Sequence, residues 1–84
     1  MPTEEELLRL HKPLVLLCAH RLLGRGVEHA DLVQEGLLGL VIAIRSHDPT
    51  KPMKLSSWIA LHATNRMRSA IRIRRRQART CPPL

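Results

Sequence analysis

The sequence predicts an all-α domain of three to four helices. The 84-residue chain contains one Trp, no Tyr and no Phe, so its apolar residues are almost entirely aliphatic, which favours helices packed through leucine ridges over a β-sandwich. Those apolar residues recur at helical spacing, and turn-forming residues at 24–26 and 47–52 separate the segments. A chain of this length builds one small core, so we expect a single domain over residues 1–80 and a short tail over 81–84.

The first segment predicts a helix that a proline interrupts. Thr3 followed by Glu6 is a capping box, so a short helix should begin there and continue to about Lys12. Pro13 should bend the helix or restart it as a first-turn residue. An apolar helix over Leu14–Leu23 should follow.

The middle segment predicts a helix that packs closely against a neighbour. Asp31, with Gln34 three residues later, supplies an N-cap for a helix that reaches about Ser46. Gly36 and Gly39 each cost about 1 kcal/mol inside a helix, which suggests that another backbone passes close on their side.

The last segment predicts a long basic helix. Ser56 can cap it, and it must have ended by Pro82. Residues 51–84 carry nine Lys/Arg and no acid, whereas residues 1–50 carry five Lys/Arg and seven Asp/Glu. Such asymmetry indicates a polyanionic partner for the second half, and nucleic acid is favoured over an anionic membrane.

Several other classes of protein are disfavoured. The apolar stretch Leu37–Ile44 is far below the ~20 residues that a membrane span requires, and the acidic Glu4–Glu6 does not suit a signal peptide. Cys18 and Cys81 lack CxxC spacing, which indicates free thiols and a cytoplasmic location. The five histidines have no metal-ligand spacing, and no catalytic constellation or phosphate loop is present, so we expect no metal, no cofactor and no enzyme.

The helical wheel of the last segment separates a core stripe from a polar stripe. The core stripe holds Ile59, Ala63, Met67, Ala70 and Ile71. The opposite stripe holds Trp58, Leu61, His62, Asn65, Arg68, Ser69 and Arg72. This stripe suits nucleic acid, because guanidinium groups bind phosphate, an amide can hydrogen-bond to a base edge, and an indole can stack on a base. A solvated helix face with Trp58 tucked against a loop is the alternative, at about even odds on the wheel alone.

The middle helix divides in the same way. Its core side holds Leu32, Val33, Leu37, Leu40, Ala43 and Ile44. Its other side places the apolar Leu38 and Ile42 beside Asp31, Gln34 and Glu35, as expected of a patch that binds a basic partner helix. The alternative, that Asp31 and Gln34 only cap the helix and Leu38 is core, is somewhat favoured by the pattern alone.

Four linked motifs resemble region 2 of the main bacterial sigma factor family. Gly24-Arg25-Gly26-Val27, the run from Asp31 to Leu40 (DLVQEGLLGL), Asp48-Pro49 and Lys54-Leu55-Ser56-Ser57-Trp58 occur in the order and at the spacing of the family's GRGV, DLxQEGxxGL, FDP and KFSTY motifs. The resemblance covers residues 7 to 72.

The resemblance implies a function for each of the two helix faces. The first would dock on the clamp helices of the RNA polymerase largest subunit through Asp31, Gln34, Glu35, Leu38 and Ile42. The second would bind minus-ten promoter DNA through Lys54, Leu55, Ser57, Trp58, Leu61, His62, Asn65, Arg68, Arg72, Arg75 and Arg76. Trp58 would stack on the flipped adenine, and Asn65 takes the position of the Gln that reads the upstream base pair.

The departures from the family pattern predict weak strand opening. Met53 and Leu55 stand where the family has aromatics, and Leu61 and His62 stand where primary members have a Trp pair. The arginines over 72–79 could compensate through phosphate contact.

Two functional hypotheses follow from the resemblance, and a third rests only on the helix-turn-helix-like architecture and the basic helix. The favoured one is a stand-alone region 2 module, for which a separate protein with a region 4-like domain supplies upstream promoter recognition. The second is a decoy or regulator of phage or plasmid type that competes with the resident sigma factor for polymerase. The third is a duplex-DNA-binding regulator independent of polymerase. A fragment of a longer sigma factor also remains open, although the ending over 81–84 resembles a natural stop.

Overall fold

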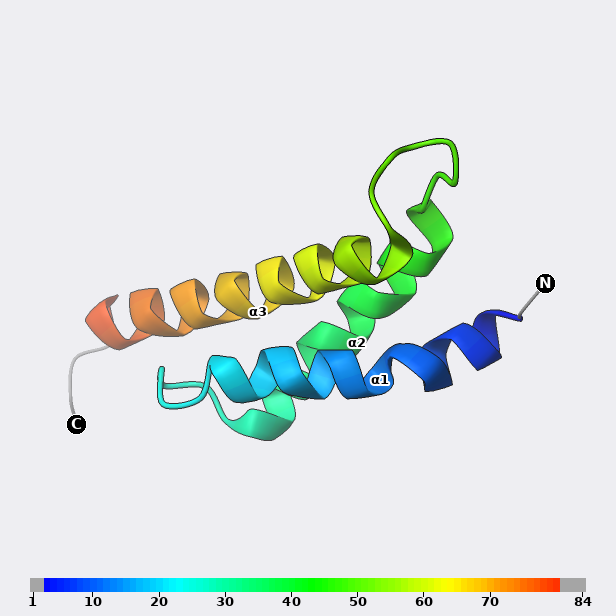
Figure 1. Ribbon diagram of the computed structural model, residues 1–84. Coiled ribbons are helices and arrows are strands. Elements are labelled where there is room, and N and C mark those ends of the chain that lie inside the picture. Colours follow the sequence, from blue (N-terminus) through cyan, green and yellow to red (C-terminus); the bar gives the residue numbers. More distant parts are fainter. Residues whose placement is uncertain (1–2, 81–84) are drawn as a thin grey trace.

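Three helices pack around one core, as the sequence predicts. The computed structural model describes residues 3–80, with side-chain surroundings to residue 77. The helices are α1 (Glu4–Arg21), α2 (His29–Ser46) and α3 (Leu55–Thr80), and the described residues include no strand. Every pair of helices is in contact, and α2 crosses both of the others (Figure 1).

The helix α1 begins as predicted but is not divided at Pro13. Thr3 is its N-cap, and the Thr3 Oγ1 accepts a hydrogen bond from the Glu6 backbone N–H at 3.2 Å. Of the two predicted effects of Pro13, a restart of the helix is wrong, because one helix continues through it to Arg21. Pro13 has no N–H to donate to the Arg9 carbonyl and its ring crowds that carbonyl, but Pro13 is exposed, so water can donate in place of the missing N–H.

The helix α2 begins earlier than its predicted cap. Its N-cap is Glu28, whose carbonyl accepts a hydrogen bond from the Leu32 N–H at 3.0 Å. Asp31 is therefore not the cap but lies inside the first turn, where its carboxylate complements the helix dipole. The α1–α2 turn before it contains Gly24 and Gly26 at φ of 81° and 91°, the left-handed region that glycine adopts without strain.

The helix α3 also begins before its predicted cap. Its first residue is Leu55, and the Trp58 backbone N–H already donates to the Lys54 carbonyl at 3.0 Å. Ser56 is thus a first-turn residue rather than the cap. The helix reaches Thr80, in agreement with an end before Pro82. The predicted tail over 81–84 lies outside the described residues.

The core is formed by aliphatic side chains from all three helices. Fully buried side chains include Val15 of α1, Leu32 and Leu40 of α2, and Ile59 and Met67 of α3. The predicted core stripe of α3 is confirmed for Ile59, Ala63, Met67 and Ile71, whereas Ala70 is half-buried. In α2, Leu32, Leu40 and Ala43 are buried, and Val33, Leu37 and Ile44 pack partly exposed against them.

Two glycines bring α2 close to its neighbours. A Cβ on Gly39 would lie 2.9 Å from both the Ala63 Cα and the His62 carbonyl oxygen. The backbone of α3 therefore passes directly against Gly39, as predicted. Gly36 instead faces side chains, since a Cβ there would meet the Met67 methyl group and the Val15 Cγ1.

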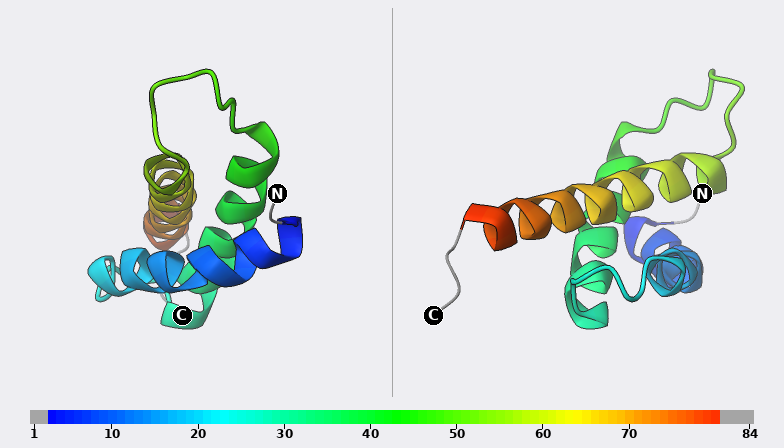
Figure 2. Two further views of the ribbon diagram at one scale, coloured as in Figure 1. Left: turned by 45° about the vertical axis from the view of Figure 1, so that its right-hand side comes forward. Right: turned by 90° about the vertical axis from the view of Figure 1, so that its left-hand side faces the viewer.

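The C-terminal end of α3 extends beyond the three-helix core. Its C-terminal turns project past α1 and α2, and the 47–54 loop arches over its other end (Figure 2). The molecule is accordingly elongated, with extents of 54 × 21 × 18 Å. The arginines beyond residue 71 lie on this projection.

Candidate functional site

The face of α2 that points away from the core joins exposed apolar and polar side chains. Leu38 and Ile42 are 51% and 42% exposed, and Asp31 and Gln34 are exposed beside them. Leu38 is therefore not a core residue, and the alternative that treated it as one is wrong. We name Asp31, Gln34, Glu35, Leu38 and Ile42 the α2 face.

Glu35 differs from the rest of the α2 face because it already has a cationic neighbour. Its Oε2 lies 3.3 Å from the Arg66 Nε of α3, and the two side chains are 34% and 41% exposed. The Arg66 Nε makes no hydrogen bond despite this proximity, so the pair is an electrostatic contact. Sequence reasoning missed Arg66, which lies on the wheel between the core stripe and the polar stripe.

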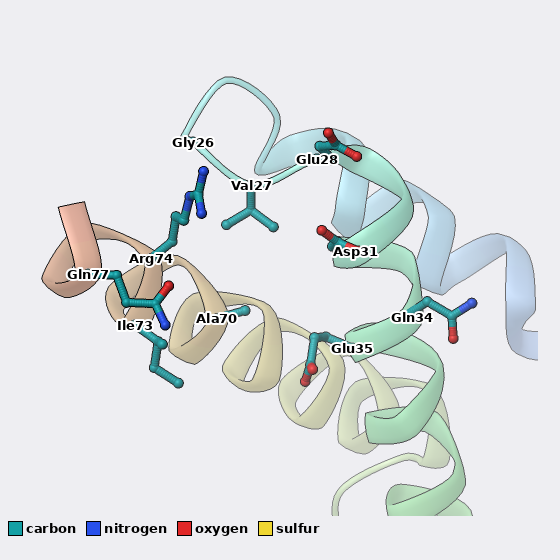
Figure 3. A pocket seen from close by; sticks show the side chains of 10 residues that line it. All are labelled: Gly26, Val27, Glu28, Asp31, Gln34, Glu35, Ala70, Ile73, Arg74 and Gln77. Carbon is teal, nitrogen blue, oxygen red and sulfur yellow. The ribbon is translucent and has the colours of Figure 1, made fainter. Parts of the chain in front are cut away.

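A pocket of about 470 Å³ opens between the α2 face and the C-terminal half of α3. Asp31 and Glu35 border it on α2, whereas Ile73 and Arg74 border it on α3. Arg74 extends toward the turn at Val27 (Figure 3). Carboxylates on one wall and a guanidinium on the other give this pocket charges of both signs.

The polar side of α3 is a basic face. Asn65, Arg68 and Arg72 are exposed, as the wheel predicts, and Arg75 is exposed as well. They line a groove of about 770 Å³, and Arg25 from the α1–α2 turn lines the same groove. Because these cations share one open groove, it can hold successive phosphates of a nucleic-acid backbone. We name Asn65, Arg68, Arg72, Arg75 and Arg25 the α3 groove.

Arg25 is a candidate nucleic-acid-binding residue that sequence reasoning missed. It stands between Gly24 and Gly26, and the positive φ of both glycines turns the chain back toward α3. The sequence signal for Arg25 was its place between two glycines, which marks an exposed turn. A helical wheel of α3 contains only residues of α3, so it could not show that this turn lies beside the helix.

Trp58 lies partly in the core rather than away from it. Its indole is half-buried, packs against the core, and donates from Nε1 to the Ser46 Oγ at 3.2 Å. The His62 ring meets it edge-on, with ring centroids 4.5 Å apart. The prediction that Trp58 lies away from the core is therefore wrong, because the ring packs against the core and its N–H is bonded to the end of α2. The alternative, which placed Trp58 against a loop, agrees with the loop residues that line the pocket beside the ring.

The uncovered side of Trp58 borders a pocket of about 400 Å³. The loop supplies most of the lining, including His47, Pro52 and Met53, and Ser46 completes it from α2. Asp48 stabilises this loop, since its Oδ1 accepts hydrogen bonds from the Thr50 hydroxyl and N–H at 2.7 and 2.9 Å. These bonds lower the pKa of Asp48 below its ordinary value of 3.8.

The remaining predicted DNA-binding residues divide by exposure. Lys54, Ser57 and Arg76 are exposed, and Leu61 is 43% exposed. Leu55 is half-buried and packs against the core, so it contributes mainly to folding.

The described part of the chain contains no group of three or more His, Cys, Asp or Glu side chains that could hold a metal ion. None of the described helices is long and apolar enough to cross a membrane.

Comparison with known proteins identifies the fold. Residues 7–77 match the family model for sigma-70 region 2. The chain is 38% identical over 58 residues to the RNA polymerase sigma-C factor of Nostoc sp., covering 69% of this chain and 14% of that protein. It is 44% identical over 45 residues to the RNA polymerase sigma factor SigA of Lactococcus lactis subsp. cremoris, covering 54% of this chain and 12% of that protein.

The chain thus spans only a small part of the relatives that it matches. The match nevertheless includes nearly all of α1, the whole of α2 and α3 as far as Gln77, and therefore both candidate faces. The chain belongs to the sigma-70 family, as a region 2 domain.

Proposed function

We propose that this chain is a transcription initiation module that docks on the RNA polymerase core and holds minus-ten promoter DNA. The observation that carries the proposal is that α2 and α3 display two faces of different chemistry while remaining in direct backbone contact at Gly39. A partner bound to the α2 face would thereby fix the orientation of the α3 groove.

The α2 face suits the arginine-rich clamp helices of the polymerase largest subunit. Its exposed centre is aliphatic through Leu38 and Ile42, and Asp31 supplies negative charge at the rim. Apolar area at the centre of an interface contributes affinity, whereas rim charges mainly set the association rate and the partner. Glu35 would reach an incoming arginine only by sharing its carboxylate with Arg66.

The α3 groove and the Trp58 pocket suit opened promoter DNA. The arginines of the groove would hold backbone phosphates without reading sequence, and Asn65 would contact a base edge. An unpaired base could enter the pocket beside Trp58 and stack on its uncovered side. Stacking of this kind recovers part of the few kcal/mol that base flipping costs.

A polymerase pull-down tests the docking half of the proposal. Asp31→Lys should weaken retention of the core enzyme, because it would place a lysine against the arginine-rich clamp helices. Asp31 is exposed and belongs to no ion pair among the described residues, so the change should leave the fold intact. Glu5→Lys makes the same charge change on exposed α1 and is the matched control. Equal retention of both variants would contradict docking through the α2 face.

A transcription assay tests the promoter half. Polymerase core, this chain and a protein carrying a region 4-like domain should together initiate at a discrete promoter. Replacing Arg72 and Arg75 by Ala should weaken promoter binding while leaving core retention intact. Unchanged promoter binding by that double variant would exclude the α3 groove as the DNA site.

One observation favours a second candidate, a decoy that occupies polymerase in place of the resident sigma factor. Trp58 is half-buried and bonded to Ser46, so only part of the ring is open for stacking. A decoy would inhibit transcription by the resident sigma factor, and Asp31→Lys would relieve that inhibition. Promoter-specific initiation in the assay above would reject the decoy.

A further inference from the structure

The outer side of α1 carries an apolar seam that no described segment covers. Leu10 is 71% exposed and Leu17 is 46% exposed, and Pro13 between them is exposed as well. With Glu6 and His20, these residues follow a four-three heptad spacing, which places them in one line along the helix. The buried residues of α1, such as Val15 and Ala19, lie on its other side.

The two ends of this seam carry charges of opposite sign. The first turn of α1 is acidic, and its last turn contains His20 and Arg21. Glu6 and Arg21 are both exposed. The ion pairs of the described residues engage Glu4 with Arg45 and Glu35 with Arg66, so neither Glu6 nor Arg21 belongs to one.

We propose that the seam binds a second copy of this chain, with the two α1 helices antiparallel. The pairs Glu6 with Arg21 and Leu10 with Leu17 share one midpoint, between Pro13 and Leu14. A two-fold axis through that midpoint places each Leu10 against Leu17 of the second copy and each Glu6 against Arg21 of the second copy. The surface therefore pairs apolar side chains with apolar ones and opposite charges with each other, as an isologous dimer requires.

This pairing leaves the proposed functional surfaces available. Neither the α2 face nor the α3 groove contains any residue of the seam. A parallel arrangement is disfavoured, because it would place Glu6 beside Glu6 and Arg21 beside Arg21. About three turns of one helix against another form a small interface, so the dimer should be weak, with a Kd on the order of 100 μM, which a concentration series can cover.

Sedimentation velocity over a concentration series tests the proposal with the whole chain. The wild-type protein should shift from monomer to dimer as its concentration rises, and Leu17→Glu should weaken association by at least about tenfold, because it places two carboxylates in the seam. Leu38→Glu makes the same change at an exposed leucine of α2 and should leave association unchanged. Circular dichroism checks that both variants keep their helices.

A charge exchange tests the antiparallel register. Glu6→Arg and Arg21→Glu should each weaken association several-fold, and the double variant should restore it, because the exchanged charges again meet opposite signs. A monomer at every concentration would overturn the proposal, as would loss of association in Leu38→Glu. Association that the double variant fails to restore would overturn the antiparallel register.

Discussion

Replacing Gly39 by Ala should destabilise the protein, although alanine is the better helix former. The new Cβ would lie 2.9 Å from the Ala63 Cα and the His62 carbonyl oxygen, whereas ordinary contact begins at 3.4 Å. Both neighbours are backbone atoms of α3 and cannot rotate away. The two helices would have to separate by about 0.5 Å, which is the difference between these distances.

The magnitude follows from two opposing effects. Overpacking of this kind costs about 3 kcal/mol at the upper end of its usual range, and the gain in helix propensity from Gly to Ala is about 1 kcal/mol. The free energy of unfolding should therefore fall by about 2 kcal/mol. For a domain of this size, the Tm should fall by roughly 10 °C.

Thermal unfolding followed by circular dichroism at the helix band measures this effect. Gly36→Ala provides a comparison, because its new Cβ would meet side chains rather than backbone: the Met67 methyl group, which can move, and the Cγ1 of the buried, β-branched Val15, which is stiff. It should also lower the Tm, through side-chain crowding. A rise in the Tm of Gly39→Ala, as helix propensity alone would give, would show that α2 and α3 are not in backbone contact and would refute the reasoning.

Three further perturbations test the α3 groove, the loop and the Trp58 side chain. Arg25→Ala should lower the slope of log affinity for promoter DNA against log salt concentration by about one, since one phosphate contact is lost; an unchanged slope would exclude Arg25 from the interface. Asp48→Ala should lower the Tm at neutral pH but not well below pH 3.8. A carboxylate whose pKa is lowered by folding stabilises the fold above its unfolded pKa, and this stabilisation is lost as the pH falls through its folded pKa. A Tm difference that does not depend on pH would contradict this origin. Ser46→Ala should cost about 1 kcal/mol by leaving the indole N–H without its acceptor, and equal Tm values for variant and wild type would show that water replaces the serine.

The division of each helix into two faces could be predicted from the sequence. A fixed angle per residue determines which side chains share a side of a helix, so the exposure of Leu38 on α2 and of Arg68 on α3 follows once each helix has a buried stripe. The close approach at Gly39 was predictable for a related reason, because a glycine inside a helix needs a compensating contact.

Helix ends and contacts between distant segments could not be predicted in the same way. Asp31 and Ser56 are good capping residues by type, yet carbonyls that precede them already accept the first helical hydrogen bonds. The approach of Arg66 to Glu35 depends on the crossing of α2 and α3, which no single helical wheel contains. The position of Arg25 depends on the path of a glycine turn for the same reason.

The partial burial of Trp58 also has a spectroscopic consequence. The chain has one Trp and no Tyr, so its near-ultraviolet fluorescence arises from this single indole. The ring borders the pocket proposed for an unpaired base while its N–H contacts the end of α2. A base that stacks on the ring should quench the emission, whereas unfolding should shift it to longer wavelength. The native protein therefore carries its own reporter, with which occupancy of the pocket and loss of the fold can be told apart without any added label.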